Sequence, residues 1–179
     1  MNKLIIIIAL LALPGCRSEM RVYSDYDPEY DLRKYHTFNW SQNINVELGK
    51  NPLQYNELND KRIKSAVQEQ MIRRGYVSST DKPDLVLHYH IIIDDQSIVT
   101  TDPHGYFYSP YWMDLRTNVY EYREGTLIID VMDPKTNNLI WRGWVASALQ
   151  ESYSPDQVEG LIKAAVAKIF RKFPKKRTN

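Results

Sequence analysis

The strongest constraint on the fold is a predicted turn flanked by two segments that read as strands with apolar side chains at alternate positions. Over residues 127–132 apolar side chains recur at every second position, which is the period of a strand with one buried face. Asp133-Pro134 predicts a turn, because aspartate accepts from backbone amides ahead of it and proline presets φ. Asn137 and Asn138 tolerate the left-handed backbone at its exit. Residues 139–148 then return as a second strand, so the chain is expected to contain an antiparallel hairpin.

Three further segments predict strands from their aromatic and β-branched content. They are residues 21–27 ("RVYSDYD"), 35–40 ("YHTFNW") and 84–93 ("DLVLHYHIII"). In the last of these, Leu85, Leu87 and Tyr89 face one way, whereas His88 and His90 face the other. Residues 28–34 read as a turn, 41–55 as a loop, and 94–115 as a long loop or a loose hairpin excursion.

Two helices are predicted from 3–4 residue spacing of apolar side chains. The first covers residues 56–74, and Gly75 suits the left-handed position that follows a helix. The second begins with Ser154, Pro155 and Gln157, which together make an N-cap, a first-turn proline and a capping box. Its apolar stripe consists of Val158, Leu161, Ile162, Ala165, Val166, Ile169 and Phe173. Gly160 interrupts this helix, and we expect it to let the helix lie close to the sheet.

Two amphipathic helices with four to six strands favour an α+β fold. We expect a largely antiparallel sheet with both helices packed on one face. Residues 21–173 then form a single domain, followed by a basic C-terminal tail at 174–179.

The N-terminal segment is typical of export. A positive start with Lys3 precedes the apolar residues 4–13, a stretch shorter than the roughly 20 residues that span a bilayer and typical of a signal peptide. The run Leu13-Pro14-Gly15-Cys16 resembles the bacterial lipobox. That resemblance implies cleavage after residue 15, a diacylglycerol on the Cys16 thiol, and an acyl group such as palmitate on the new amino terminus. Residues 1–15 are then a lipoprotein signal peptide and 16–20 a lipidated tether.

The single cysteine has one alternative explanation. The chain contains one Cys, which cannot form an internal disulfide, so a secreted protein with a stray free thiol is the competing interpretation. Arg17 follows in place of an aspartate, and by resemblance to enterobacterial sorting the expected location is the outer membrane, on the periplasmic side or the cell surface. Without Lys3 the 23 basic side chains become 22, equal to the 22 acidic ones, so net charge gives no reason to expect nucleic-acid binding.

Three stretches together resemble the DUF4136 family of bacterial lipoproteins of unknown function. They are the opening "YSDYDPEYDLRKYHTFNW", the mid-chain "RGY" followed by "KPDLVLHYHI", and the block "EGTLIIDVMDPKTNNLIWRGWVASAL". The resemblance covers residues 20–172 and implies an α+β fold and a lipid-anchored envelope protein. The family has no agreed activity or active-site residues, so it assigns no role to any residue here.

His88 and His90 are the candidates for metal binding. Two imidazoles on one strand face could bind Zn²⁺ or Cu²⁺ if a third ligand approached, and His104, Asp94, Asp95 or Asp102 could supply it. The alternative is an ordinary sheet face that carries histidine beside valine and isoleucine. Asp130 lies within an apolar strand, where a carboxylate needs a partner or a raised pKa, and Arg142 on the return strand could pair with it.

An aromatic segment is the candidate for partner binding. It contains Tyr106, Phe107, Tyr108, Tyr111 and Trp112, followed by Tyr120 and Tyr122. Tyrosine and tryptophan combine a large contact area with a polar tip, which suits binding surfaces and membrane interfaces. These side chains could instead cover the open sheet face and complete the core. The basic tail with Lys172, Lys175, Lys176 and Arg177 is either a solvated end or a contact for anionic lipid.

From these residues we expect a non-enzymatic, lipid-anchored envelope protein that binds a protein partner or envelope component through the aromatic segment. We expect no cofactor apart from the covalent lipid on Cys16. The sequence contains no phosphate-binding glycine loop, nucleophile elbow or zinc-protease motif. One alternative is a metal-binding or hydrolytic lipoprotein that uses His88, His90 and an acidic loop residue. Another is a purely structural role in outer-membrane assembly.

Overall fold

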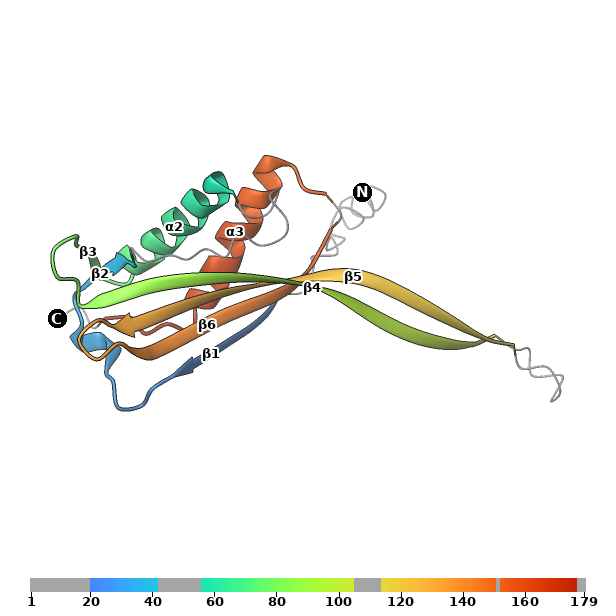
Figure 1. Ribbon diagram of the computed structural model, residues 1–179, viewed down its shortest axis with the longest axis horizontal. Helices are drawn as coiled ribbons and strands as arrows, with labels where there is room; N and C mark the ends of the chain where they lie inside the picture. Colours follow the sequence, from blue (N-terminus) through green and yellow to red (C-terminus); the bar gives the residue numbers. More distant parts are fainter. Residues whose placement is uncertain (1–19, 42–55, 105–113, 151, 177–179) are drawn as a thin grey trace, which may run out of the picture.

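The computed structural model describes residues 20–41, 56–104, 114–150 and 152–176, and over 96–104 and 114–122 it describes the backbone alone. The sheet contains six strands in the order β1-β6-β5-β4-β2-β3 (Figure 1). Their bounds are β1 Arg21–Tyr26, β2 Thr37–Trp40, β3 Val77–Ser78, β4 Leu85–His104, β5 Asp114–Asp133 and β6 Asn138–Leu149. A short 3₁₀ helix, η1 at Leu32–Lys34, lies in the predicted turn between β1 and β2.

The sheet is mixed, with an antiparallel body and a parallel edge. β1, β6, β5 and β4 pair antiparallel in that order, whereas β2 pairs parallel with both β4 and β3. The parallel edge follows from the helix between β2 and β4, because two adjacent parallel strands need a crossover connection. The α+β fold is confirmed, and the expected antiparallel arrangement holds for the body of the sheet.

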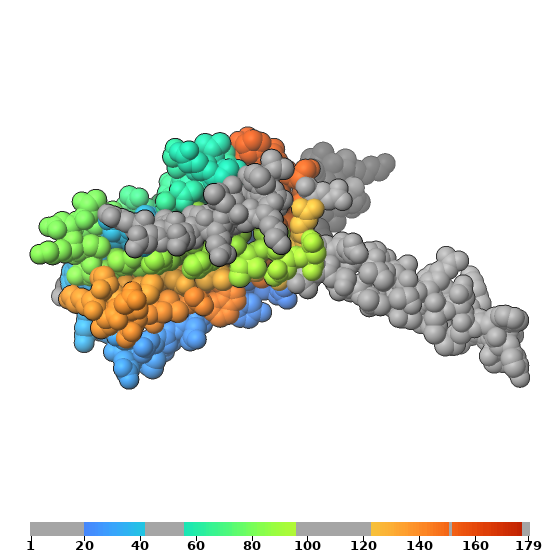
Figure 2. All heavy atoms as spheres, viewed as in Figure 1, coloured from blue at the N-terminus to red at the C-terminus, as the bar shows by residue number. Residues whose placement is uncertain are grey.

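Both helices cover the same face of the sheet (Figures 1 and 2). α2 spans Glu57–Ile72, with Asn56 as its N-cap accepting from the Asn59 amide, and α3 spans Pro155–Phe170. The capping box at the start of α3 is formed: Ser154 Oγ accepts from the Gln157 amide at 3.3 Å, and Gln157 Oε1 accepts from the Ser154 amide at 2.8 Å. Gly75 adopts φ +87°, as predicted.

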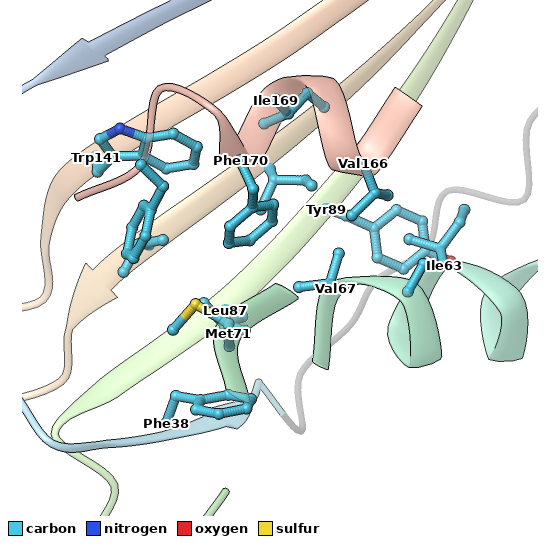
Figure 3. Close-up of a cluster of buried hydrophobic side chains, with 14 of the residues drawn as sticks. Phe38, Ile63, Val67, Met71, Leu87, Tyr89, Trp141, Val166, Ile169 and Phe170 are labelled. Atoms are coloured by element: carbon cyan, nitrogen blue, oxygen red, sulfur yellow. The ribbon is translucent and has the colours of Figure 1, made fainter. Parts of the chain in front are cut away.

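The core lies between this face and the two helices (Figure 3). Alternate residues of β4 and β5, such as Leu85, Leu87 and Ile129, are fully buried beneath α2 and α3. At the end of the core where α3 terminates, Trp141 packs edge-to-face on Phe173 and tilted against Phe170. Aromatic rings contribute large buried areas and pair favourably at these angles, so this end of the core is closed.

Gly143 permits the close approach of α3 to β6. A Cβ atom at this position would lie 2.2 Å from Trp141 Cη2 and 2.6 Å from Ile169 Cγ2, so the indole and the helix occupy the space that any side chain would need. Gly160, in contrast, has no atom within 4 Å of its Cβ position and is exposed. The expectation that Gly160 brings the helix close to the sheet was wrong: Gly143, on the strand, does so.

Asp84 fixes the parallel edge of the sheet. Its Oδ2 accepts from the backbone amides of His36 and Thr37 at 2.8 and 2.9 Å, and its own amide donates to Thr37 Oγ1 at 2.9 Å. These backbone hydrogen bonds hold the pKa of the Asp84 carboxyl below its usual range. The start of β4 is thereby joined to the start of β2, which gives the Pro-Asp-Leu sequence at 83–85 a structural role.

Within the segment 94–115, the described residues 94–104 and 114–115 belong to strands, and not to the long loop that was one of the two interpretations. β4 continues to His104 and β5 begins at Asp114, with pairing in register from Asp94–Glu124 to His104–Asp114. β5 pairs with β6 only from Arg123 onward. The paired segments 96–104 and 114–122, here called the arm, therefore extend past the sheet as a two-stranded ribbon (Figure 1). The backbone of the arm pairs as a ribbon although the sequence there shows no clear strand period.

The two glycines give a matched test of this packing. We expect Gly143→Ala to lower the free energy of unfolding by about 1–3 kcal/mol, because the added methyl group would overlap atoms of Trp141 and Ile169. Gly160→Ala, which meets no atom, is expected to raise it by about 0.5–1 kcal/mol through helix propensity. Urea unfolding followed by circular dichroism measures both, and equal effects of the two substitutions would contradict the packing described here.

Candidate functional site

The helix-free face of the sheet carries a polar cluster that spans three strands. His88 on β4 lies opposite Asp130 on β5, and Asp130 lies opposite Arg142 on β6. His90 is two residues further along β4. The Asp130 side chain is only 6% exposed, whereas that of Arg142 is 43% exposed, so the carboxylate lies beneath its partners.

Asp130 and Arg142 form a bidentate ion pair. Arg142 Nε donates to Asp130 Oδ1 at 2.6 Å, and Nη2 donates to Oδ2 at 2.7 Å, the fork geometry in which guanidinium and carboxylate bind most strongly. The hydrogen bond from Asp130 raises the pKa of Arg142. His90 Nε2 lies 3.5 Å from Asp130 Oδ2 on the other side. The pairing predicted from the sequence is confirmed, and it occupies both oxygens of the carboxylate.

His88 is the most buried imidazole of the cluster. Burial is the main cause that lowers the pKa of His88. Asp130 opposes this effect and His90 adds to it, so the ring is neutral at pH 7. His88 and His90 do share one face of β4, as expected. Among the described side chains, no group of three or more histidine, cysteine or acidic residues lies close enough to hold a metal ion, and the His104 and Asp102 side chains are outside those described.

Apolar and aromatic side chains surround this cluster. Trp144 stacks on Tyr23 of β1 with ring centroids 5.5 Å apart, while Tyr23 and Ile92 remain 49% and 44% exposed. Trp141 and Trp144 lie on opposite faces of β6, and Trp141 is the buried one of the two. The ion pair thus lies in a largely apolar surface, where it is shielded from water more than a typical surface pair.

The chain enters the sheet at the end from which the arm leaves. β1 begins at Arg21, opposite Ala146, and the Arg21 guanidinium pairs with Glu124 at the base of the arm. No local sequence signal could have identified this pair, because its partners are 103 positions apart. Any tether before residue 20 therefore joins the domain beside the arm.

Several of the predicted site residues lie outside the described residues. They are the lipid-attachment candidate Cys16 and the aromatic candidates Tyr106, Phe107, Tyr108, Tyr111 and Trp112. The last described pair of the arm is His104–Asp114, so the chain that carries the aromatic candidates connects the two strands of the arm. In the described part of the chain, no helix is both long enough and apolar enough to cross a membrane.

A family model for a domain of unknown function, DUF4136, matches residues 22–175. The chain belongs to the DUF4136 family. The stretches that suggested this relation now have structural explanations: Asp84 ties β4 to β2, and Asp130 pairs with Arg142 across the hairpin. No curated protein matches the sequence.

Comparison with solved structures finds similarity at low sequence identity. A PDZ domain protein from Parabacteroides distasonis is 14% identical with a TM-score of 0.55; the match covers 99% of this chain but only 41% of that protein. PelC from Paraburkholderia phytofirmans, solved as a dodecamer, is 9% identical with a TM-score of 0.49, covering 89% of this chain and 100% of PelC. The first likeness indicates a shared α+β architecture and nothing about activity.

The ion pair can be tested through its pH dependence. We expect Arg142→Gln to lower the free energy of unfolding by about 2 kcal/mol at pH 7, below the 3–5 kcal/mol of a fully buried pair because Arg142 is partly exposed. In the variant the Asp130 carboxylate stays buried without its cation, and a buried unpaired charge is costly only in the ionised form. Acid removes this charge, so the deficit should be smaller at pH 4 than at pH 7.

Arg123→Gln is the control for this measurement. Arg123 lies 3.6 Å from Asp95, whose side chain is 92% exposed, and such pairs contribute little. Its loss should change stability by less than about 0.5 kcal/mol at either pH. A deficit in Arg142→Gln that is the same at pH 4 and pH 7 would contradict a buried, charge-compensated Asp130.

Proposed function

We propose that this protein is a lipid-anchored component of the bacterial cell envelope that binds a protein partner or envelope component through its arm, without catalysing a reaction. The observation that carries the proposal is the arm itself. Over 96–104 and 114–122 its two strands pair only with each other among the described residues. An isolated two-stranded ribbon is at best marginally stable in water and needs a third strand or a packing surface.

The open edges of the arm favour a binding role. An unpaired strand edge presents a row of amide and carbonyl groups that a partner strand can join. The chain that links the two strands contains Tyr106, Phe107, Tyr108, Tyr111 and Trp112, residue types that dominate binding hot spots. The backbone edges of the arm and the aromatic side chains of the linking segment would together give affinity and selectivity for a partner.

The anchor on Cys16 follows from the leader and suits the geometry of the domain. Only three residues separate Cys16 from Met20 in the sequence, and β1 starts at the base of the arm. An acylated Cys16 would therefore hold that end of the domain at a membrane, with the arm beside it. Several acyl chains on one residue give stable attachment, whereas a single chain binds only marginally. With Arg17 after the cysteine, the outer membrane is the proposed location.

The polar cluster on the sheet supports a non-enzymatic role. Asp130, which is the buried carboxylate of the described residues nearest to His88 and His90, is held by Arg142 through both oxygens. The Arg142 guanidinium neutralises this carboxylate in place. The cluster is thus better suited to holding β4, β5 and β6 together than to proton transfer.

Site-specific photo-crosslinking tests the binding role. A photoreactive phenylalanine analogue placed at Tyr108 or at Trp112 should form a discrete crosslinked product with an envelope component when intact cells are irradiated. The matched control carries the analogue at Ala164, an exposed position of α3, and should give no such product. When Tyr108, Tyr111 and Trp112 are all replaced with alanine, any growth or envelope phenotype that depends on the partner should be lost. The far-ultraviolet circular dichroism of the purified variant should stay unchanged.

Two results would contradict the proposal. Equal crosslinking from Tyr108, Trp112 and Ala164 would show that the segment linking the two strands of the arm makes no specific contact with a partner. A triple alanine variant that loses its fold would show that these aromatic side chains belong to the core rather than to a binding surface.

A further inference from the structure

A second feature, unconnected with the polar cluster, is an apolar cleft between the sheet and the helices. It has a volume of about 150 Å³ and lies beneath the N-terminal halves of α2 and α3. Leu127 and Val145 contribute from the sheet, Ile63 from α2, and Ile162 from α3, while Met20 lies at its edge. The cleft is therefore at the end of the sheet where the chain enters and the arm departs.

The lining of the cleft is suited to hydrocarbon. None of the described residues that form it carries a charge, and its polar members are Asn59, Thr126, Ser147 and Tyr153. Many of its apolar side chains are only half-buried, namely Met20, Ile91, Ile93, Leu149, Val158, Leu161 and Ile162. The opposite end of the same core is closed by Trp141, Phe170 and Phe173, which are all buried. Apolar surface left partly open to water favours the binding of an apolar group.

The size of the cleft limits what can enter. An apolar cavity of about 150 Å³ in another protein stays dry and accepts a molecule of the size of benzene. A whole lipid molecule is much larger than the volume of the cleft. One end of an extended hydrocarbon chain suits both the volume and the apolar lining of the cleft.

The N-terminal tether indicates which hydrocarbon chain is within reach. Met20 contributes to the cleft, and Cys16 is four residues before it, a separation of at most about 14 Å along an extended chain. The acyl groups of a lipidated Cys16 would thus be attached close to the opening.

We infer that the cleft binds the end of one acyl chain carried by Cys16 of the same molecule, while the other chains remain in the membrane. This inference rests on the lipid anchor proposed above. Methylene groups are stabilised in the cleft and in the bilayer by the same burial of apolar surface, so one chain can enter the protein while the remaining two keep the anchor stable. An acyl chain held in the cleft would orient the protein, because it would keep the base of the arm against the membrane surface.

Photoreactive fatty acids test this directly. Cells are grown with a fatty acid that carries a diazirine at its methyl end and are irradiated with the protein in its native membrane, after which the peptides are identified by mass spectrometry. We expect a crosslink between the Cys16 lipopeptide and the peptides of α3 or β6 that line the cleft. Ile162→Trp, which fills the cleft, should remove most of this crosslink. Ala164→Trp, on the exposed side of the same helix, should leave it unchanged.

A second variant protects against a trivial loss of fold. Val158→Trp narrows the cleft at a half-buried position in the first turns of α3 and should also reduce the crosslink. Circular dichroism melting of both variants identifies any that unfold, and the crosslink yield of the folded variants decides the question.

Each outcome has a distinct meaning. If Cys16 is acylated but its acyl chains crosslink only to lipids or to exposed helix positions, the inference is overturned and the proposed anchor is not affected. Cleft peptides linked to a membrane lipid rather than to the Cys16 peptide show that a different hydrocarbon occupies the site, which also overturns it. A Cys16 without lipid overturns both this inference and the proposed anchor.

Discussion

The pairing of β5 with β6 is the constraint on which the rest of the structure depends, because each face of this pair makes a different demand. On the helix side, Trp141 and Ile169 fill the space above Gly143, so α3 lies directly on the strand. On the other side, Arg142 holds the buried Asp130. Residues 141–143 therefore serve both faces of the sheet. Trp141 and Gly143 lie on the core side, and Arg142 neutralises the Asp130 carboxylate on the other side.

This central pair also explains why the two ends of the molecule differ. At one end, Trp141, Phe170 and Phe173 pack on one another and close the core. At the other, β6 ends at Leu149 while β4 and β5 continue, so the arm leaves the sheet without a third strand. The apolar cleft, the entry of the chain at Met20 and the base of the arm all lie at this open end. A membrane anchor and a partner-binding arm at one end of the domain would act on the same surface.

Local sequence patterns were sufficient for most of the secondary structure. The capping box at Ser154 and the turn at Asp133 formed as predicted, with Asn137 at φ +58° and Asp133 Oδ1 accepting from the Lys135 amide at 2.8 Å. The Asp130–Arg142 pair was also foreseen, because a carboxylate within an apolar strand requires a partner and the hairpin register supplies one.

What could not be predicted depended on distant contacts. Nothing in residues 37–40 specifies that β2 runs parallel to β4, since that follows from the crossover through α2. The arm was hard to recognise because its sequence shows no clear alternation, so its strands are apparent only from the pairing of β4 with β5. Gly143 and Gly160 look alike in sequence, and only the position of Trp141 distinguishes a required glycine from a replaceable one. The Arg21–Glu124 pair and the cleft likewise arise from segments far apart in the chain.

Hydrogen exchange of the arm tests the central functional claim most directly. In the purified, lipidated protein in detergent, the amides of 96–104 and 114–122 should exchange much faster than those of β5 and β6 in the sheet, because a lone ribbon opens locally at little cost. In native membranes, where the proposed partner is present, these same amides should become protected while those of the sheet stay unchanged. Arm amides that exchange equally fast in both preparations, or that are already as protected as the sheet in the purified protein, would contradict the account.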